Sequence, residues 1–204
     1  MIIDPPKLTN QESSHWITDL VIPRPIAWVS TVDARGIYNL APFSAYGMVS
    51  TKPMVVGFSV GTDRNGKKKD TLNNAEWAKD FVVNLVTDEL AEAMNVTAAG
   101  WPSDVSEFKM AKLTPVKADL VKSPLLAESP MSMECRVLQI MPFGQMPSMY
   151  HFIIGEVVRV HIKDEFYDKK NKRIIGLRAV GRLGGESDLY CHGKDTFEMK
   201  RPTI

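Results

Sequence analysis

The chain has 204 residues, of which 44% are hydrophobic, and this fits one domain over residues 1–204 with a sizeable core. The 25 basic and 24 acidic residues leave a net charge of +1, so no global field recruits nucleic acid or an anionic membrane. No apolar run reaches the ~18 residues of a membrane span, and neither a signal-peptide pattern nor a metal-like cysteine spacing is present. We therefore expect a cytoplasmic protein, without a metal, in which Cys135 and Cys191 are reduced.

The N-terminal arm, residues 1–20, starts with a polar stretch that prolines interrupt. We expect this arm to wrap the surface and to contain a short helix capped near Asn10 or Ser13. One face of this helix carries Trp16, Ile17 and Leu20.

Two strands joined by a tight turn are predicted for residues 24–50. The apolar run Pro25–Val32 is followed by turn residues 33–36 and by a second run that starts at Ile37. The second run carries Asn39, Pro42, Phe43, Ser44 and Tyr46 among small residues. Small side chains leave room for a ligand, and hydroxyls and amides can orient it.

A basic stretch precedes the next predicted helix. Met54–Val60 reads as a third strand, and the polar loop after it contains lysines at 67–69. Such a run alone is typical of a solvated loop. A helix can begin at Asp70 and Thr71, however, and its free N–H groups would attract anions. The stretch is therefore either a solvated loop or a phosphate cradle.

The middle of the chain predicts a central strand and a long excursion. Asp80–Thr87 is apolar on both faces, which indicates burial on both sides. A helix follows from Asp88 and is ended by Gly100 and Pro102. Residues 103–130 form a long excursion with one helical turn, either a lid or interface arm or a packing element.

The last third predicts an antiparallel pair of strands, Met131–Pro142 and Met149–Ile162. Glu134 and Arg136 share a face there, and we expect them to form an ion pair. The later residues comprise a charged segment at 164–172, a small-residue turn GRLGG at 181–185 and a C-terminal tail at 186–204. No zinc, Walker, dinucleotide-fingerprint or hydrolase-elbow motif is present.

Several segments, taken in order, resemble one family. They are RPIAWVSTVD, G-x-x-NLAPFS, KDTLNNAEWAKDFVVNLV, LAEAMNVT, HFIIGEVVRVHI and GRLGG. The sequence resembles the flavin reductase-like, FMN-binding split-barrel family over residues 20–185. The resemblance implies a mainly β protein with helices, a six-stranded antiparallel Greek-key split β-barrel, an FMN cofactor and a homodimer.

The resemblance also implies where FMN would bind, with ring and ribityl chain along residues 28–31 and 43–45 and phosphate near 69–71. His151 either lies close to the flavin ring and the nicotinamide side, as a catalytic residue, or fills the core. Arg24 either is a surface charge or reaches the polar edge of the flavin. The cofactor-binding residues so implied are Trp28, Val29, Ser30, Thr31, Phe43, Ser44, Ala45, Lys69, Asp70, Thr71 and Arg182.

The function that the resemblance implies is reduction of FMN by NADH or NADPH, followed by transfer of electrons to free flavin, a partner oxygenase or a small acceptor. The absence of a recognisable nucleophile suits a cofactor that carries the chemistry. Two alternatives stay open: an FMN-binding electron carrier without nicotinamide activity, and a flavin-free binding protein on the same scaffold.

Overall fold

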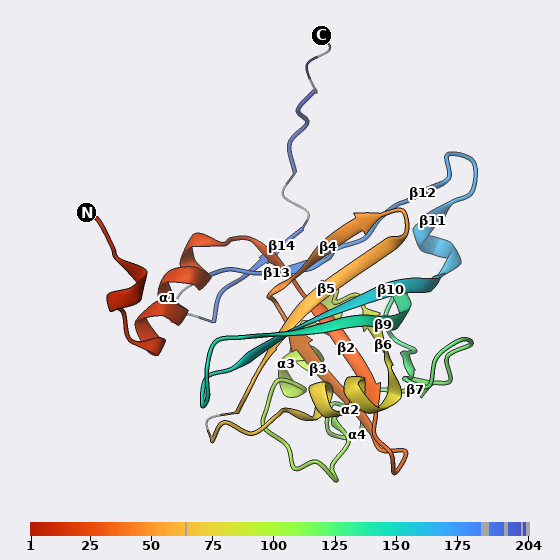
Figure 1. Ribbon diagram of the computed structural model, residues 1–204. Coiled ribbons are helices and arrows are strands. Elements are labelled where there is room, and N and C mark those ends of the chain that lie inside the picture. Colours follow the sequence, from red (N-terminus) through yellow and green to blue (C-terminus); the bar gives the residue numbers. More distant parts are fainter. Residues whose placement is uncertain (64, 185–187, 194–195, 201, 203–204) are drawn as a thin grey trace.

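The computed structural model describes residues 1–63, 65–184, 188–193, 196–200 and 202. A seven-stranded sheet in the order β3-β2-β6-β9-β10-β5-β4 forms its centre (Figure 1). Every neighbouring pair in this sheet is antiparallel, as predicted. In chain order its strands are β2 Ala27–Val32, β3 Tyr38–Phe43, β4 Tyr46–Thr51, β5 Met54–Gly61, β6 Asp80–Asn84, β9 Met131–Phe143 and β10 Tyr150–Ile162.

The sheet curls until its two ends meet at one corner. β3 and β4 lie at opposite ends of the strand order, yet only Ser44 and Ala45 separate them in the chain. At this corner the Ser59 N–H donates to the Ala45 carbonyl oxygen at 2.9 Å. β3 and β4 remain the two edge strands of the sheet, so hydrogen bonding among the described residues does not close it into a complete barrel. The predicted count of six strands is not confirmed, because the second strand of the predicted hairpin bends at this corner and continues as β4.

The predicted hairpin and the predicted central strand are both present. β2 pairs with β3, and all six residues of β2 are buried. Alternate residues of β2 serve different clusters, since Val29 packs with Phe58 and Phe81, whereas Trp28 packs with Leu40. All of β6 is likewise buried, between β2 and β9, although it ends at Asn84 rather than at residue 87.

Helices and short strands complete the fold. The helix α2 starts where it was predicted and packs its apolar face on the core, whereas α3 and α4 lie near β3. Their bounds are α1 Asn10–Leu20, α2 Asp70–Ala78, α3 Ala91–Val96 and α4 Glu107–Met110, with 3-10 turns η1 Pro5–Lys7, η2 Asp88–Leu90 and η3 Asp164–Phe166. The short strands are β1 Arg24–Pro25, β7 Pro115–Val116, β8 Leu125–Leu126, β11 Tyr167–Asp168, β12 Arg173–Ile174, β13 Val180–Arg182 and β14 Tyr190–His192.

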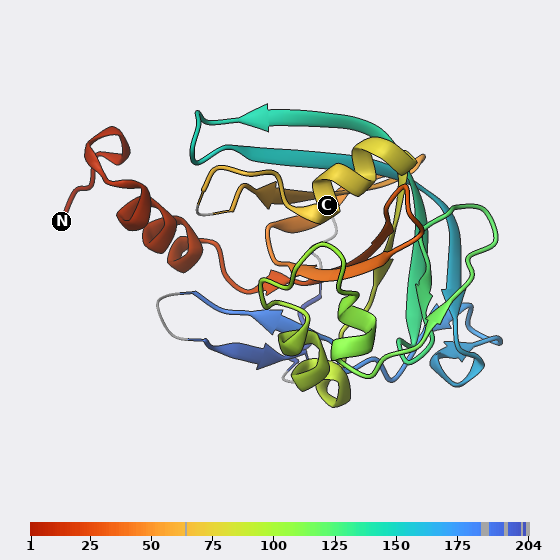
Figure 2. The ribbon, with the colours of Figure 1, turned by 90° about the horizontal axis from the view of Figure 1, so that it is seen from below.

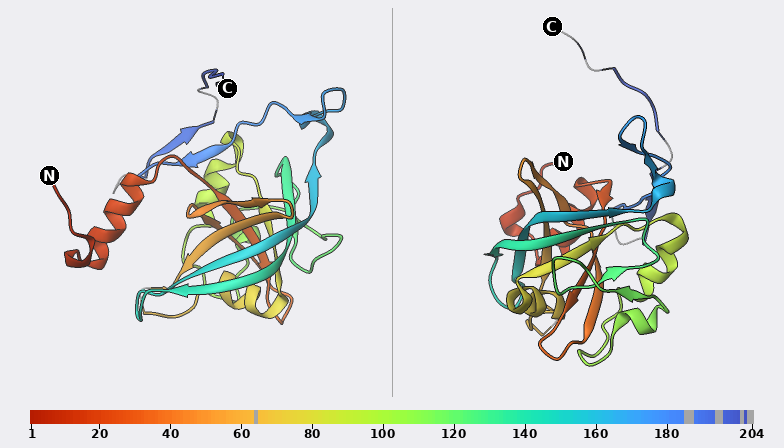
Figure 3. Two further views of the ribbon diagram at one scale, coloured as in Figure 1. Left: turned by 45° about the horizontal axis from the view of Figure 1, so that its top comes forward. Right: turned by 90° about the vertical axis from the view of Figure 1, so that its right-hand side faces the viewer.

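The N-terminal helix projects from the rest of the chain (Figures 2 and 3). Its start is close to the prediction, because Thr9 caps it and forms a capping box with Glu12. The prediction that the arm wraps the surface is wrong: α1 has no buried residue, and Ile17 and Leu20 are 58% and 72% exposed.

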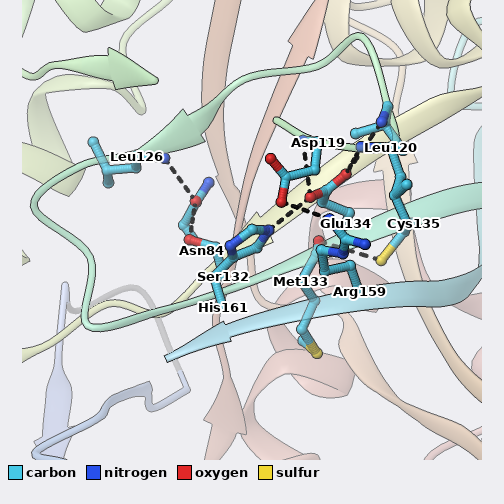
Figure 4. Close-up of polar contacts among 11 residues, drawn as sticks. Asn84, Asp119, Leu120, Leu126, Ser132, Met133, Glu134, Cys135, Arg159 and His161 are labelled. Atoms are coloured by element: carbon cyan, nitrogen blue, oxygen red, sulfur yellow. Dashed lines mark hydrogen bonds and ion pairs between the residues drawn. The ribbon is translucent and has the colours of Figure 1, made fainter. Parts of the chain in front are cut away.

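The end of the long excursion is tied to the sheet by two carboxylates. Glu134 on β9 is fully buried and accepts hydrogen bonds from the backbone N–H groups of residues 119–121 at 3.1, 2.6 and 3.1 Å. Its Oε1 also lies 2.6 Å from His161 Nε2 (Figure 4). The predicted pair with Arg136 is wrong, because Arg136 is exposed and Glu134 is engaged elsewhere.

Asp80 anchors the adjoining residues in the same way. Its carboxylate accepts from the backbone N–H groups of Lys122 and Ser123 at 3.0 and 3.1 Å and from the Ser123 hydroxyl at 2.7 Å. The segment 119–123 is therefore a packed element rather than a lid.

The C-terminal part returns to the N-terminal side of the molecule. β1 pairs with β13, which pairs with β14, so part of the predicted tail is a strand. Gly185, from the predicted GRLGG turn, lies outside the described residues. In the part of the chain that the structure describes, no helix has both the length and the apolar character needed to cross a membrane. Cys135 and Cys191 are both free.

Candidate functional site

A cavity of about 380 Å³ opens beside β3. Three segments that are distant in sequence form its walls: Asn39 and residues 41–43 on β3, Asp63 with residues 67–71 at the start of α2, and residues 97–103 after α3, together with Glu107. The basic stretch and the small-residue strand singled out from the sequence thus meet around one space.

The β3 wall is held in place from behind and from the side. β2 lies along β3 with Thr31 opposite Asn39 and Trp28 opposite Pro42. Asn39 Nδ2 donates to Thr71 Oγ1 at 3.0 Å, which links β3 to the first turn of α2. This bond fixes the distance between the strand wall and the helix terminus.

The start of α2 is arranged to receive an anion. Lys69 is the N-cap residue and makes no side-chain capping bond, and the first N–H groups of a helix have no intrahelical partner. These groups belong to Asp70 and Thr71, which both line the cavity. Lys68 is paired with Glu76 at 2.6 Å. The ammonium groups that remain to add positive charge to this end are those of Lys67 and Lys69, which both line the cavity.

Three carboxylates also line the cavity, those of Asp63, Asp70 and Glu107. Glu107 is only 6% exposed, and its Oε2 accepts from the Leu40 N–H at 3.0 Å. Burial raises the pKa of Glu107, and the charge of Asp70 adds to the rise. Burial also raises the pKa of Asp70, against the opposing charges of Lys67 and Arg35. The positive charge of the cavity is therefore concentrated at the lysines rather than spread over its walls.

Four residues predicted to bind the cofactor line this cavity: Phe43, Lys69, Asp70 and Thr71. The predicted run at 28–31 does not, because all four of its side chains are fully buried. Trp28 Nε1 donates to Thr97 Oγ1 at 2.9 Å, the Ser30 hydroxyl donates to the Pro124 carbonyl oxygen, and Thr31 Oγ1 accepts from Asn74 at 3.1 Å. The buried residues that the structure does not bring to the cavity are Trp28, Val29, Ser30 and Thr31.

The other predicted residues lie elsewhere. Ser44 and Arg182 line a second cavity of about 340 Å³ that shares Pro42 and Ala98 with the first. Ala45 is exposed at the bend between β3 and β4. His151 is buried in β10 opposite Val60 and lines neither cavity, and its Nδ1 has no hydrogen-bond partner among the described residues.

The segment 97–103 and Glu107 were not predicted to line a cavity. In the sequence, Gly100 and Pro102 indicated only the end of a helix. The available signal was the row of small residues at 98–100, which leaves open space beside the chain, as in the second predicted strand. Nothing local indicates that this row would face β3.

A model of the flavin reductase like domain matches residues 20–176. The chain belongs to the flavin reductase-like family. The resemblance noted in the sequence is thereby confirmed, and the family supports a flavin oxidoreductase.

Several known proteins are similar to this chain over nearly its whole length. Nitrilotriacetate monooxygenase component B from Bacillus cereus superposes with a TM-score of 0.91 at 33% identity, over 98% of each chain. The 2-nitrobenzoate 2-nitroreductase of Pseudomonas fluorescens gives a TM-score of 0.88 at 28% identity, over 100% of this chain and 98% of that chain. An uncharacterized protein of Halalkalibacterium halodurans is 36% identical over 100% of this chain and 98% of its own length.

Proposed function

We propose that this member of the flavin reductase-like family binds FMN in the 380 Å³ cavity and catalyses its reduction by NADH or NADPH. One observation carries the proposal: a helix terminus without a side-chain cap, next to two lysines that have no ion-pair partner among the described residues, stands at one end of a cavity. The other wall of this cavity is β3, with Asn39, Ala41, Pro42 and Phe43. A phosphate at one end and a flat ring at the other match these two features.

The residues present fit the parts of FMN. Lys67, Lys69 and the first N–H groups of α2 would hold the phosphate, and Asn39 and Thr71 lie next to them to meet ribityl hydroxyls. The strand wall at 41–43 and the segment 97–103 would lie on either side of the ring and exclude water from it. The chemistry supplied by bound FMN is acceptance of a hydride from reduced nicotinamide and onward transfer of electrons.

The electrons would pass to free flavin, to a partner oxygenase or to a small acceptor. The similarity to a protein named as component B of a monooxygenase supports an oxygenase partner, and the similarity to a nitroreductase supports a small acceptor. An FMN-binding electron carrier that does not react with nicotinamide is the alternative.

Titration with FMN followed by anaerobic mixing with NADH and NADPH tests the proposal. We expect quenching of flavin fluorescence at micromolar protein and then loss of the oxidised-flavin absorbance with at least one nicotinamide. Binding without bleaching by either donor would select the electron carrier. If FMN does not bind, both flavin-dependent functions are excluded, and the flavin-free binding protein is the hypothesis that stands.

We also propose that the protein is a homodimer. The helix α1 stands away from the sheet (Figure 2). Both α1 and β4, the strand at the end of the strand order, expose apolar side chains. Ile17 and Leu20 on α1, and Met48 and Val49 on β4, are between 51% and 75% exposed. Exposed apolar surface on an edge strand and on a projecting helix is typical of a protein–protein interface, and a second copy of the chain would bury it.

Sedimentation equilibrium at low micromolar concentration tests the dimer. We expect twice the mass of the chain, with an interface of roughly 2,000 Å² or more. Substitution of Leu20 and Met48 by glutamate should give a folded monomer, whereas the same change at the exposed Leu138 on β9 serves as a control. A wild-type chain that sediments as a folded monomer would contradict the proposal.

A further inference from the structure

The second cavity, of about 340 Å³, is lined by side chains of α1, β1, β13 and β14 and adjoins the first cavity at Pro42 and Ala98. Its β3 side includes Ser44, which follows the end of that strand. A strand rises about 3.3 Å per residue, so Ser44 lies well beyond Asn39 and the phosphate end of the first cavity. The second cavity therefore adjoins the end at which a flavin ring would lie.

Two arginines stand side by side in this cavity. Arg24 on β1 and Arg182 on β13 are directly opposite each other in the antiparallel pair. Like charges in this position repel each other. Arg24 is only 8% exposed, and burial together with the charge of Arg182 lowers the pKa of Arg24. The fold thus concentrates positive charge where water screens it poorly.

The carboxylates that oppose this charge lie at the rim. Arg182 Nη2 contacts Asp188 Oδ1 at 2.8 Å, but the Asp188 side chain is 90% exposed. An ion pair with so exposed a partner contributes little to stability. Among the described residues, Asp19 is the acid whose charge acts on Arg24, and it too is exposed. A ligand oxyanion can therefore take the place of the Asp188 carboxylate.

The two guanidinium groups have different tasks. Arg24 donates to Ser44 Oγ at 3.4 Å, to the carbonyl oxygens of Val21 and Leu183 at 2.9 and 3.0 Å, and to that of Thr18. These bonds join α1 to the C-terminal sheet, so Arg24 supplies charge but few free donors.

Arg182 keeps donors for a ligand. Its described hydrogen bonds go to the Tyr190 hydroxyl and to Asp188, and its guanidinium carbon lies over the Tyr190 ring at 4.6 Å from the centroid. This leaves other N–H groups of the guanidinium available, since the group carries five. An arginine held in this way with free donors is suited to bidentate binding of a phosphate or carboxylate.

We propose that the cavity lined by Arg24 and Arg182 binds an oxyanion of the second substrate. The source is the diphosphate of the nicotinamide donor or the carboxylate of an acid acceptor. The inference rests on the proposed function for the identity of that substrate, but the anion-binding property belongs to the cavity itself.

Calorimetric titration with inorganic pyrophosphate and with benzoate, on FMN-loaded protein, tests the cavity directly. We expect wild type to bind at least one probe and Arg182→Met to bind that probe about tenfold or more weakly, the loss of one charge-assisted contact. The matched control is Arg178→Met, which removes the same charge from a 51% exposed arginine that lines neither cavity. If Arg182→Met weakens the binding of pyrophosphate, the oxyanion is the diphosphate of the nicotinamide donor. If it weakens the binding of benzoate, the oxyanion is the carboxylate of an acid acceptor.

A second variant keeps the test decisive if Arg182→Met fails to fold. Asp188→Asn removes the exposed counter-charge and should strengthen probe binding severalfold. Wild type that binds neither probe, or equal losses in Arg182→Met and Arg178→Met, would overturn the inference.

Kinetics with two electron donors separates this inference from the proposed function. The uncharged donor 1-benzyl-1,4-dihydronicotinamide has no phosphate, so under the diphosphate assignment Arg182→Met should raise the KM for NADH or NADPH and leave that donor unaffected. If wild type is not bleached by any nicotinamide while the probes still bind through Arg182, the proposed function fails and the anion cavity stands.

Discussion

Replacing Lys67 and Lys69 together by alanine is expected to weaken FMN binding by about a hundredfold, because each charge-assisted hydrogen bond to a phosphate contributes about 1.5–3 kcal/mol. Both side chains line the cavity beside the uncapped start of α2. Riboflavin, which lacks the phosphate, should bind the variant nearly as well as it binds wild type, since the β3 wall is untouched. Calorimetric titration of both ligands measures the ratio.

The control is Lys117→Ala with Lys170→Ala, which removes the same charge from two exposed lysines outside the cavity. This control should leave both affinities unchanged at physiological salt, where distant charges are screened. Equal losses for FMN and riboflavin would mean that the lysine variant has damaged the fold. No change for either ligand would mean that the lysine run is a solvated loop and that the phosphate binds elsewhere.

Local patterns were sufficient for most elements of the fold. The hairpin of β2 and β3 follows from an apolar run, a turn and a second run, and α2 begins where Asp70 follows the lysines. The corner between β3 and β4 could not be predicted, because Ser44 and Ala45 carry no strong turn signal and the bend is imposed by closure of the sheet. The exposure of the apolar face of α1 was also not predicted. An amphipathic pattern shows that a helix face is apolar, but not whether the same chain or another one packs against it.

The site was predicted in part for a related reason. The lysines and the first turn of α2 were found because a helix start is a local feature. The hydroxyls of Ser30 and Thr31 were assigned to the ligand, yet they are satisfied by Pro124 and Asn74, which are remote in sequence. A polar residue in an apolar strand shows that a partner exists, but only the fold shows whether that partner is a ligand.

Replacing Glu134 by alanine is expected to lower the free energy of unfolding by about 3 kcal/mol or more, because three backbone N–H groups lose a carboxylate acceptor at a cost of about 1 kcal/mol or more each. The fully buried carboxylate accepts from three backbone N–H groups at 119–121 and contacts His161 (Figure 4). Without it, these donors lose their acceptor and the end of the excursion loses its anchor. Urea unfolding followed by circular dichroism measures the change.

The matched control for this change is Glu128→Ala. Glu128 accepts from the Thr114 N–H at 3.1 and 3.2 Å, elsewhere in the same excursion, but it is only half-buried. Water can replace its carboxylate, so we expect a loss of about 1 kcal/mol or less. If Glu134→Ala costs no more than Glu128→Ala, the buried carboxylate is not the anchor of residues 119–121.

The pH dependence of the same residue gives a second, independent expectation. Burial raises the pKa of Glu134, but the hydrogen bonds from His161, Leu120 and Asp119 outweigh it and hold the pKa below its ordinary value of 4.5. A lowered pKa in the folded state means that ionised Glu134 stabilises the fold above the pKa of the unfolded chain, and that this contribution disappears as the pH falls through the folded pKa. Glu134→Gln keeps the shape and removes the charge, so the stability difference between wild type and Glu134→Gln should shrink between about pH 5 and about pH 3. If the stability difference between wild type and Glu134→Gln stays constant or grows as the pH falls over this range, the ionised form of Glu134 does not stabilise the folded state.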